Sequence, residues 1–187
     1  MADVKISELP AASALVAGDL FPAVQDDGGL VTRKATAAQI GAYVRGLAGT
    51  VRQVVRATPG TVTGTTTSAT YVDYGVNLNI TPTSTSSIVL LFANFIGSAS
   101  SSSNDAFAEF AIRTGSTLIK AQYIFINIAG VTAVGSEVPV AIAAWHSPAT
   151  TSAVNYKISF SAGSGSSAVI VAASEYPVDL FALEVTQ

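Results

Sequence analysis

Short apolar stretches, interrupted by clusters of Ser, Thr, Gly and Pro, dominate the chain after about residue 50. In residues 156–161 apolar and polar side chains alternate, which is typical of a strand with one buried face. Evenly spaced short strands indicate an all-β sandwich or barrel. We therefore predict a mainly β fold, an antiparallel, jelly-roll-like β-sandwich. The predicted strands are residues 51–56, 70–78, 87–96, 106–114, 116–127, 137–146, 155–163, 169–174 and 178–186.

The first 49 residues have a different pattern. Two strand-like stretches, residues 19–25 and 30–34, flank the turn sequence Asp-Asp-Gly-Gly, which predicts a hairpin because Gly accepts positive φ. Thr36 and Gln39 then have the spacing of a helix capping box. The apolar residues that follow have the spacing of one helix face: Ile40, Tyr43, Val44 and Leu47. A helix of two to three turns is unstable alone, so this face is expected to need a partner.

Composition separates the same two parts of the chain. Residues 1–56 hold six of the nine Lys and Arg and five of the twelve acids, whereas the rest of the chain carries a net charge of −4. The 21 Ser and 19 Thr fall mostly after residue 50. We predict two domains, residues 1–49 and 50–187.

Charge and hydropathy exclude several classes of protein. The chain is 49% hydrophobic and 11% charged, with a net charge of −3, so we expect no nucleic-acid binding. The longest apolar runs, such as residues 88–93, are far shorter than the ~20 residues that span a bilayer, and the first residues lack the pattern of a signal peptide. We expect no membrane insertion. There is no Cys, which excludes disulfides and thiol chemistry. So low a charge fraction also favours a chain whose apolar surface is covered by copies of itself.

Candidate catalytic groups are few. His146 is the only histidine, and no Gly-x-Ser-x-Gly motif accompanies it. Asp105 and Glu109 lie four residues apart on a predicted strand, which places them on one face about 13 Å apart, beyond the ~6.5–9.5 Å of an inverting glycosidase. The Asp-Asp-Gly turn lacks the alternating acids of a calcium loop. We predict no catalytic residue, no cofactor and no metal site.

Three sequence blocks resemble one protein family. Residues 6–10 (ISELP), 18–25 (GDLFPAVQ) and 32–40 (TRKATAAQI) resemble, in order and spacing, the N-terminal attachment module of tailed-bacteriophage fibre and spike proteins. Phe21 stands where the family pattern has Leu. The remainder resembles the β-sandwich heads of phage fibres more weakly. The resemblance implies a homotrimer that docks to a phage capsid or tail protein. The family's long shaft or catalytic β-helix is missing, which favours a short head fibre, a capsid decoration or a compact tail tip.

Together these observations predict a non-enzymatic virion structural protein that is made in the host cytoplasm. It binds the virion through its N-terminus and the host surface through its sandwich, and the candidate ligand there is a host-surface glycan. The alternatives are a small glycan hydrolase acting on host polysaccharide and a cellular lectin-like module. The predicted attachment residues are Ile6, Leu9, Pro10, Leu20, Phe21, Val24, Arg33 and Lys34. The predicted trimer interface is Ile40, Tyr43, Val44 and Leu47. The candidate receptor contacts are Asn104, Trp145 and His146, beside loops expected at the far end of the sandwich.

Overall fold

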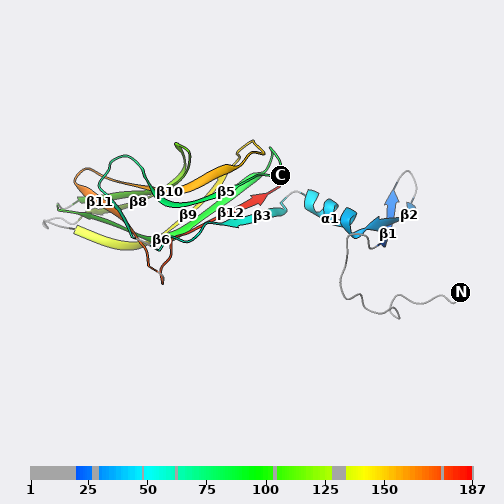
Figure 1. Ribbon diagram of the computed structural model, residues 1–187, viewed down its shortest axis with the longest axis horizontal. Helices are drawn as coiled ribbons and strands as arrows, with labels where there is room; N and C mark the ends of the chain where they lie inside the picture. The colour runs from blue at the N-terminus through cyan, green and yellow to red at the C-terminus, as the bar shows by residue number, and fades with distance from the viewer. Residues whose placement is uncertain are drawn as a thin grey trace. The chain divides into compact units, whose positions relative to one another are not determined.

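The computed structural model describes residues 20–26, 30–47, 49–61, 63–102, 105–127, 134–173 and 175–186. The chain divides into two compact units, Met1–Thr50 and Val51–Gln187, and each is described by itself. Figure 1 shows the first unit in blue and cyan and the second in cyan through red.

The first unit is a hairpin followed by a helix. Strand β1 (Leu20–Asp26) pairs antiparallel with β2 (Leu30–Thr36), and α1 spans Ala37–Gly46. The Thr36 hydroxyl accepts a hydrogen bond from the backbone N–H of Gln39, and the Gln39 side chain accepts one from the backbone N–H of Thr36. The predicted hairpin, helix and capping box are therefore confirmed. Gly49, at a φ of +78°, follows the helix end, a conformation that glycine adopts without strain.

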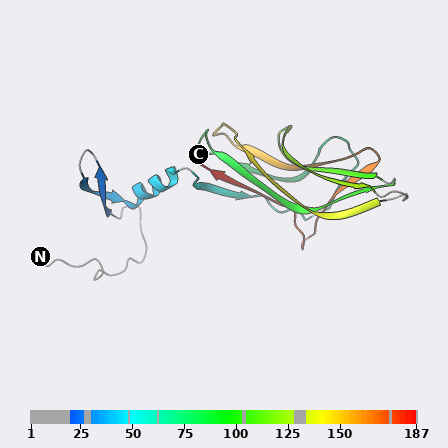
Figure 2. The same cartoon turned by 180° about the vertical axis from the view of Figure 1, so that it is seen from behind.

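The second unit is an antiparallel β-sandwich, as predicted. Its strands are β3 (Val51–Arg56), β4 (Gly64–Thr66), β5 (Val72–Ile80), β6 (Ile88–Ser101), β7 (Asp105–Thr114), β8 (Thr117–Asn127), β9 (Val134–His146), β10 (Val154–Ala162), β11 (Ser166–Val171) and β12 (Asp179–Val185). One sheet has the order β5-β10-β7-β8, and the other contains β3, β12, β6, β11, β4 and β9. Figures 1 and 2 show the two sheets as two layers.

Strand β6 organises the six-stranded sheet. Along one side it pairs with β9 over its whole length. Along the other side its first half pairs with β12 and its second half with β11. Because β3 pairs with β12, the unit begins and ends at the same end of the sandwich. We call the opposite end, where the β6–β7, β8–β9 and β10–β11 connections lie, the far end.

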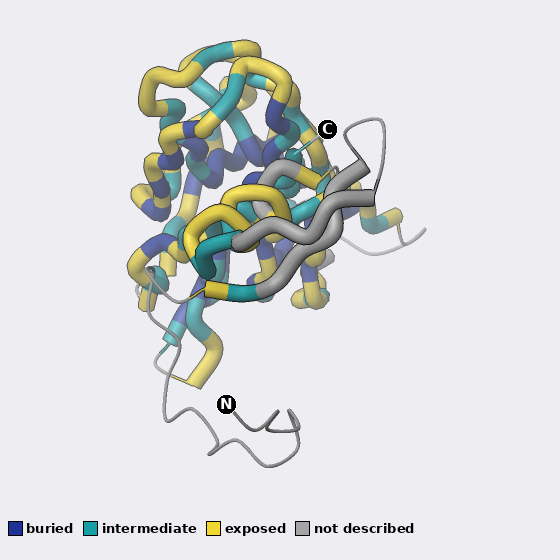
Figure 3. The backbone as a smooth tube through the Cα atoms, turned by 90° about the vertical axis from the view of Figure 1, so that its right-hand side faces the viewer, coloured by how far each residue is buried: buried dark blue, intermediate teal, exposed yellow. Residues whose placement is uncertain are grey.

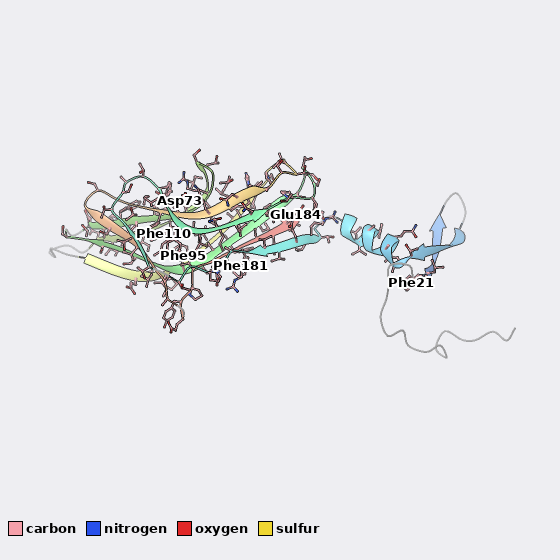
Figure 4. The ribbon with its side chains drawn as sticks, in the orientation of Figure 1. Phe21, Asp73, Phe95, Phe110, Phe181 and Glu184 are labelled. Carbon is pink, nitrogen blue, oxygen red and sulfur yellow. The ribbon has the colours of Figure 1, made fainter. Side chains whose placement is uncertain are left out.

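The core lies between the sheets. Along strands such as β12 and β5, buried residues that face the core alternate with more exposed residues that face outward (Figure 3). Phe95 of β6 and Phe110 of β7 meet edge to face, with ring centroids 5.4 Å apart, and Figure 4 labels both. A Cβ at Gly97 would come within 2.9 Å of the Phe110 ring, so glycine is required for this approach. Large aromatic side chains thus set the spacing of the layers around one small residue on β6.

The sequence misplaced some strand ends. The predicted strand of residues 87–96 ends too early, because the small residues 97–101 continue β6 between β9 and β11. Strand β4 was not predicted at all. In β5 the register with β10 shifts near Gly75, whose φ of +100° marks a bulge. Small residues with a low strand propensity can therefore form a strand when neighbouring strands on both sides supply backbone hydrogen bonds.

Candidate functional site

Six side chains form a patch on the outer face of the four-stranded sheet, next to the far end. In the register of β7 and β8 they form three cross-strand pairs: Asp105 with Asn127, Phe107 with Phe125 and Glu109 with Tyr123. Alternate residues of a strand share a face, so all six point away from the core. We call them the β7–β8 patch. Phe125 is 64% exposed and Tyr123 57%, unusually high values for aromatic rings.

Glu109 is held in place by groups on both sides. The Tyr71 hydroxyl donates a short hydrogen bond to Oε1 of Glu109, and the guanidinium of Arg113 lies over the Tyr71 ring at 5.1 Å. Tyr71 thus reaches from Arg113 to Glu109, past the position of Ala111. Ala111 faces outward but is fully buried, which this placement of Tyr71 explains.

The Glu109 carboxylate raises the pKa of two neighbouring tyrosines. The pKa of Tyr71 is raised well above its ordinary value, first by burial and then by the hydrogen bond to Glu109. The pKa of Tyr123 is also raised, chiefly because its hydroxyl bonds to Glu109. Both phenols therefore stay protonated at neutral pH and act as donors to the carboxylate. Phe107 packs beside Tyr123, with centroids 5.7 Å apart, which completes a fixed arrangement of rings around Glu109.

The six-stranded sheet has a different outer face. Val54, Leu183, Leu90 and Trp145 lie opposite one another on β3, β12, β6 and β9. We call these four residues the apolar row. Trp145 is 67% exposed and Val54 61%, and no member of the row except the indole can form a side-chain hydrogen bond. Beside it, Arg56 pairs with Asp179 at 2.6 Å and lies over the Phe181 ring, so the adjacent charges neutralise each other.

His146 does not share the exposure of its neighbour Trp145. It follows Trp145 on β9 and therefore faces the interior. Its Nδ1 lies 2.7 Å from the hydroxyl of the fully buried Tyr156. Burial lowers the pKa of His146 and raises that of Tyr156 to about 12, so both are neutral at neutral pH. His146 is therefore half-buried and is hydrogen-bonded to a core residue, whereas Trp145 is exposed on the other face of the sheet.

Of the two other candidate receptor contacts, the structure describes only Trp145. Trp145 lies opposite Leu90, at the end of β6 remote from Ser101. Asn104 lies outside the described residues, in the connection that follows Ser101 and Ser102. Trp145 and Ser101 therefore lie at opposite ends of the pairing between β6 and β9.

The predicted trimer residues of α1 are exposed in this chain. Tyr43 is 71% exposed, and Ile40, Val44 and Leu47 exceed 40%. Of the predicted attachment residues, Leu20 is exposed and Phe21 half-buried in β1. Val24 lies in β1, and Arg33 and Lys34 in β2, but their side chains are outside the described set. Ile6, Leu9 and Pro10 lie outside the described residues altogether.

A buried carboxylate that the sequence analysis did not single out lies in the core. Glu184 of β12 is fully buried, and its oxygens accept hydrogen bonds from Ser87 Oγ at 2.6 Å, Thr83 N at 2.6 Å and Gln53 Nε2 at 2.6 Å. Burial alone would raise its pKa, but these hydrogen bonds outweigh burial and lower the pKa to about 2. Glu184, labelled in Figure 4, thus joins β12 to β3 and to the β5–β6 connection. Its role is structural.

Candidate metal ligands do not cluster among the described side chains. No set of three or more His, Asp or Glu among them has metal-binding geometry. Asp105 and Glu109 are on one face of β7 in unbroken register with β8, so the separation of about 13 Å expected from strand geometry applies. No helix in the described part of the chain has the length and apolarity needed to cross a bilayer.

No protein-family model matches the chain, and no curated protein matches it. Solved structures of infectious bursal disease virus do match. The Gt strain structure is 16% identical with a TM-score of 0.33, over 96% of this chain and 46% of that one. Derived T=1 particles of the same virus give 14% identity and a TM-score of 0.30, over 96% and 45%. The chain spans less than half the length of these proteins, and likeness this weak does not extend to function.

Proposed function

We propose that the chain is a non-enzymatic structural protein of a bacteriophage virion: a short homotrimeric head fibre, capsid decoration or tail-tip protein. The N-terminal unit docks to a capsid or tail protein, and the sandwich contacts the host surface. The observation that carries the proposal is the exposed apolar face of α1. The three sequence blocks that resemble phage attachment modules support it from the same part of the chain.

The α1 face requires a partner for a physical reason. A ten-residue helix beside a two-stranded hairpin is at best marginally stable in water. Its start is well capped, but Ile40, Tyr43, Val44 and Leu47 remain exposed. Packing against other copies or against a virion protein removes this apolar surface from water. Closed rotational symmetry is the usual way for identical chains to do so, and the resemblance implies three of them.

A second apolar surface supports assembly from copies. The apolar row exposes Trp145 and Val54 beside Leu183 and Leu90, and the ion pair next to it is already neutralised. Contiguous exposed apolar side chains of this kind are candidates for a protein contact. The occupant that we propose is another copy of the chain, in keeping with its low charged fraction of 11%.

The test uses particles of the phage that encodes the chain, prepared without it. Purified full-length chain should decorate these particles, whereas a chain starting at Thr50 should not. Val44→Asp should reduce both trimer formation and decoration, because it buries an unpaired charge. Ala38→Asp is the matched control: it puts the same charge on the opposite, exposed face of α1 and should leave both intact. Decoration by the chain starting at Thr50 would overturn the attachment assignment.

The hydrolase alternative has its own readout. Release of reducing sugar from host polysaccharide, lost on substitution of Asp105 or Glu109, would replace the binding proposal with an enzymatic one. A full-length chain that binds host cells without releasing sugar agrees with the proposal.

A further inference from the structure

We propose that the β7–β8 patch is a binding site for a neutral saccharide. The inference deepens the proposed function, because it rests on the sandwich contacting the host surface and names the ligand class and the residues. The sugar stacks on the Phe125 and Phe107 rings, and its hydroxyls donate hydrogen bonds to Glu109 on one side and to the Asp105–Asn127 pair on the other.

The order of the three cross-strand pairs matches the layout of a sugar ring. An aromatic pair, Phe107 and Phe125, lies between two pairs that contain carboxylates. The two outer pairs are about 13 Å apart along the strands, from the rise per residue. A pyranose ring offers C–H groups on its faces and hydroxyls around its edge. A flat patch with rings at its centre and acceptors at its margins complements that distribution.

The side chains of the patch are already held in place, which lowers the entropic cost of binding. Glu109 is bonded to the Tyr71 and Tyr123 hydroxyls. A Cβ at Gly163 would lie only 3.0 Å from Phe107 Cβ, which shows how closely the β10–β11 connection packs on this residue. A carboxylate has about four acceptor positions, so Glu109 can hold both tyrosines and still accept from a ligand.

The charges of the patch select the ligand. It contains two carboxylates, and the nearest guanidinium, Arg113, is occupied by the Tyr71 ring, Asp73 and the carbonyl of Ser116. Acidic sugars and nucleic acids would bring further negative charge toward Glu109 and Asp105, which disfavours both. An apolar protein surface would bury these carboxylates without compensation. A neutral saccharide meets neither penalty.

The position suits recognition by several copies. The patch adjoins the far end, opposite the end at which the sandwich unit begins and ends. One shallow, flat site of this kind binds weakly. Three copies on one fibre raise the avidity by about 10²–10⁴ through effective concentration, without further contacts.

The experiment is binding of the full-length chain to an array of neutral and acidic oligosaccharides, followed by titration of lactose against 3′-sialyllactose as a pair that differs by one acidic sugar. Binding to neutral glycans is expected, with a loss of at least tenfold in Phe125→Ser and in Tyr123→Ala. Tyr176→Ser, which removes an equally exposed aromatic ring outside the patch, should bind as the unsubstituted chain does. Glu109→Gln should weaken the preference for neutral over acidic glycans.

The outcomes separate this inference from the proposed function. It is overturned if no neutral glycan binds, if only acidic glycans bind, or if the patch variants bind as the unsubstituted chain does. If host cells bind the chain and Phe125→Ser binds them equally well, the patch assignment fails while the virion role stands. If the chain fails to decorate virions but its neutral-glycan binding depends on Phe125, the virion role fails and the patch stands.

Discussion

The outer faces of both sheets expose aromatic rings, but the side chains around these rings are aliphatic on one sheet and polar on the other. On the six-stranded sheet, Trp145 is surrounded by the aliphatic members of the apolar row. On the four-stranded sheet, Tyr123 and Phe125 lie among carboxylates and an amide. Burial in a dry protein contact stabilises aliphatic side chains. Carboxylates are destabilised by such burial unless they keep hydrogen bonds to water or to hydroxyl groups. The neighbours of an exposed ring therefore indicate its partner better than its exposure does.

Both outer faces depend on one shared core, so the largest effect is expected from a substitution in that core. Phe110→Ala should destabilise the sandwich by about 3–5 kcal/mol, because it empties a fully buried position between the sheets. Phe92→Ala is the outer-face control, since Phe92 is 39% exposed, and should cost no more than about 1 kcal/mol. Chemical denaturation followed by circular dichroism measures both. Equal losses would mean that the inner and outer faces are not distinct.

Glu184 gives the core a dependence on pH. Its pKa is about 2 in the folded chain against an ordinary 4.5, so its hydrogen bonds stabilise the fold above pH 4.5. That stabilisation, about 3 kcal/mol, is lost as the pH falls from about 4.5 to 2. Denaturation at a series of pH values should show this decline. Glu184→Gln should be less stable at pH 7, and its stability should fall less between pH 5 and 2; a parallel decline would contradict the assignment.

Part of this picture was predictable from the sequence. Short apolar stretches bounded by Ser, Thr, Gly and Pro identified nine of the ten described strands of the sandwich, and turn residues and capping identified the hairpin and α1. Alternation also implies that Trp145 and His146 point to opposite faces of the sheet. The network around Glu184 was not predictable, because Gln53, Thr83 and Ser87 are distant in sequence and meet only through strand pairing.

The β7–β8 patch illustrates the limit more sharply. The sequence predicts consecutive strands at residues 106–114 and 116–127, and their aromatic residues can be read from it directly. A bulge between Ile112 and Arg113 shifts the register by one residue, which brings Glu109 opposite Tyr123 and Phe107 opposite Phe125. Without that shift, Phe107 would pair with Ile124 and Glu109 with Gln122. Phe125 and Tyr123 would then lie on the opposite face of the sheet from Phe107 and Glu109. No glycine or other local signal marks the bulge, so the sequence could not have assembled the patch.

Self-association distinguishes the two outer faces directly. Leu183→Asp places a charge in the middle of the apolar row and should weaken association of the chain at least tenfold, or about 1.4 kcal/mol. Phe125→Asp places the same charge in the β7–β8 patch and should leave association unchanged. Sedimentation over a range of concentrations measures both. If Phe125→Asp dissociates the chain and Leu183→Asp does not, the roles of the two faces must be exchanged.

The smallest effect tests how firmly Glu109 is held. Glu109→Gln removes a negative charge from beside the Tyr71 hydroxyl, so the pKa of Tyr71 should fall, although burial keeps it above its ordinary value. Because the folded-state pKa of Tyr71 is the higher one, its stabilising contribution is present below pH 10 and is lost as the pH rises further. Absorbance of ionised tyrosine across an alkaline titration reports the shift, and the change in stability at pH 7 should stay within about 1 kcal/mol. Tyr176→Phe is the control, since it removes an exposed phenol outside the patch and should leave the titration of Tyr71 unchanged. An unaltered Tyr71 in Glu109→Gln would mean that the carboxylate is not fixed by this hydroxyl and is free to turn away from a ligand.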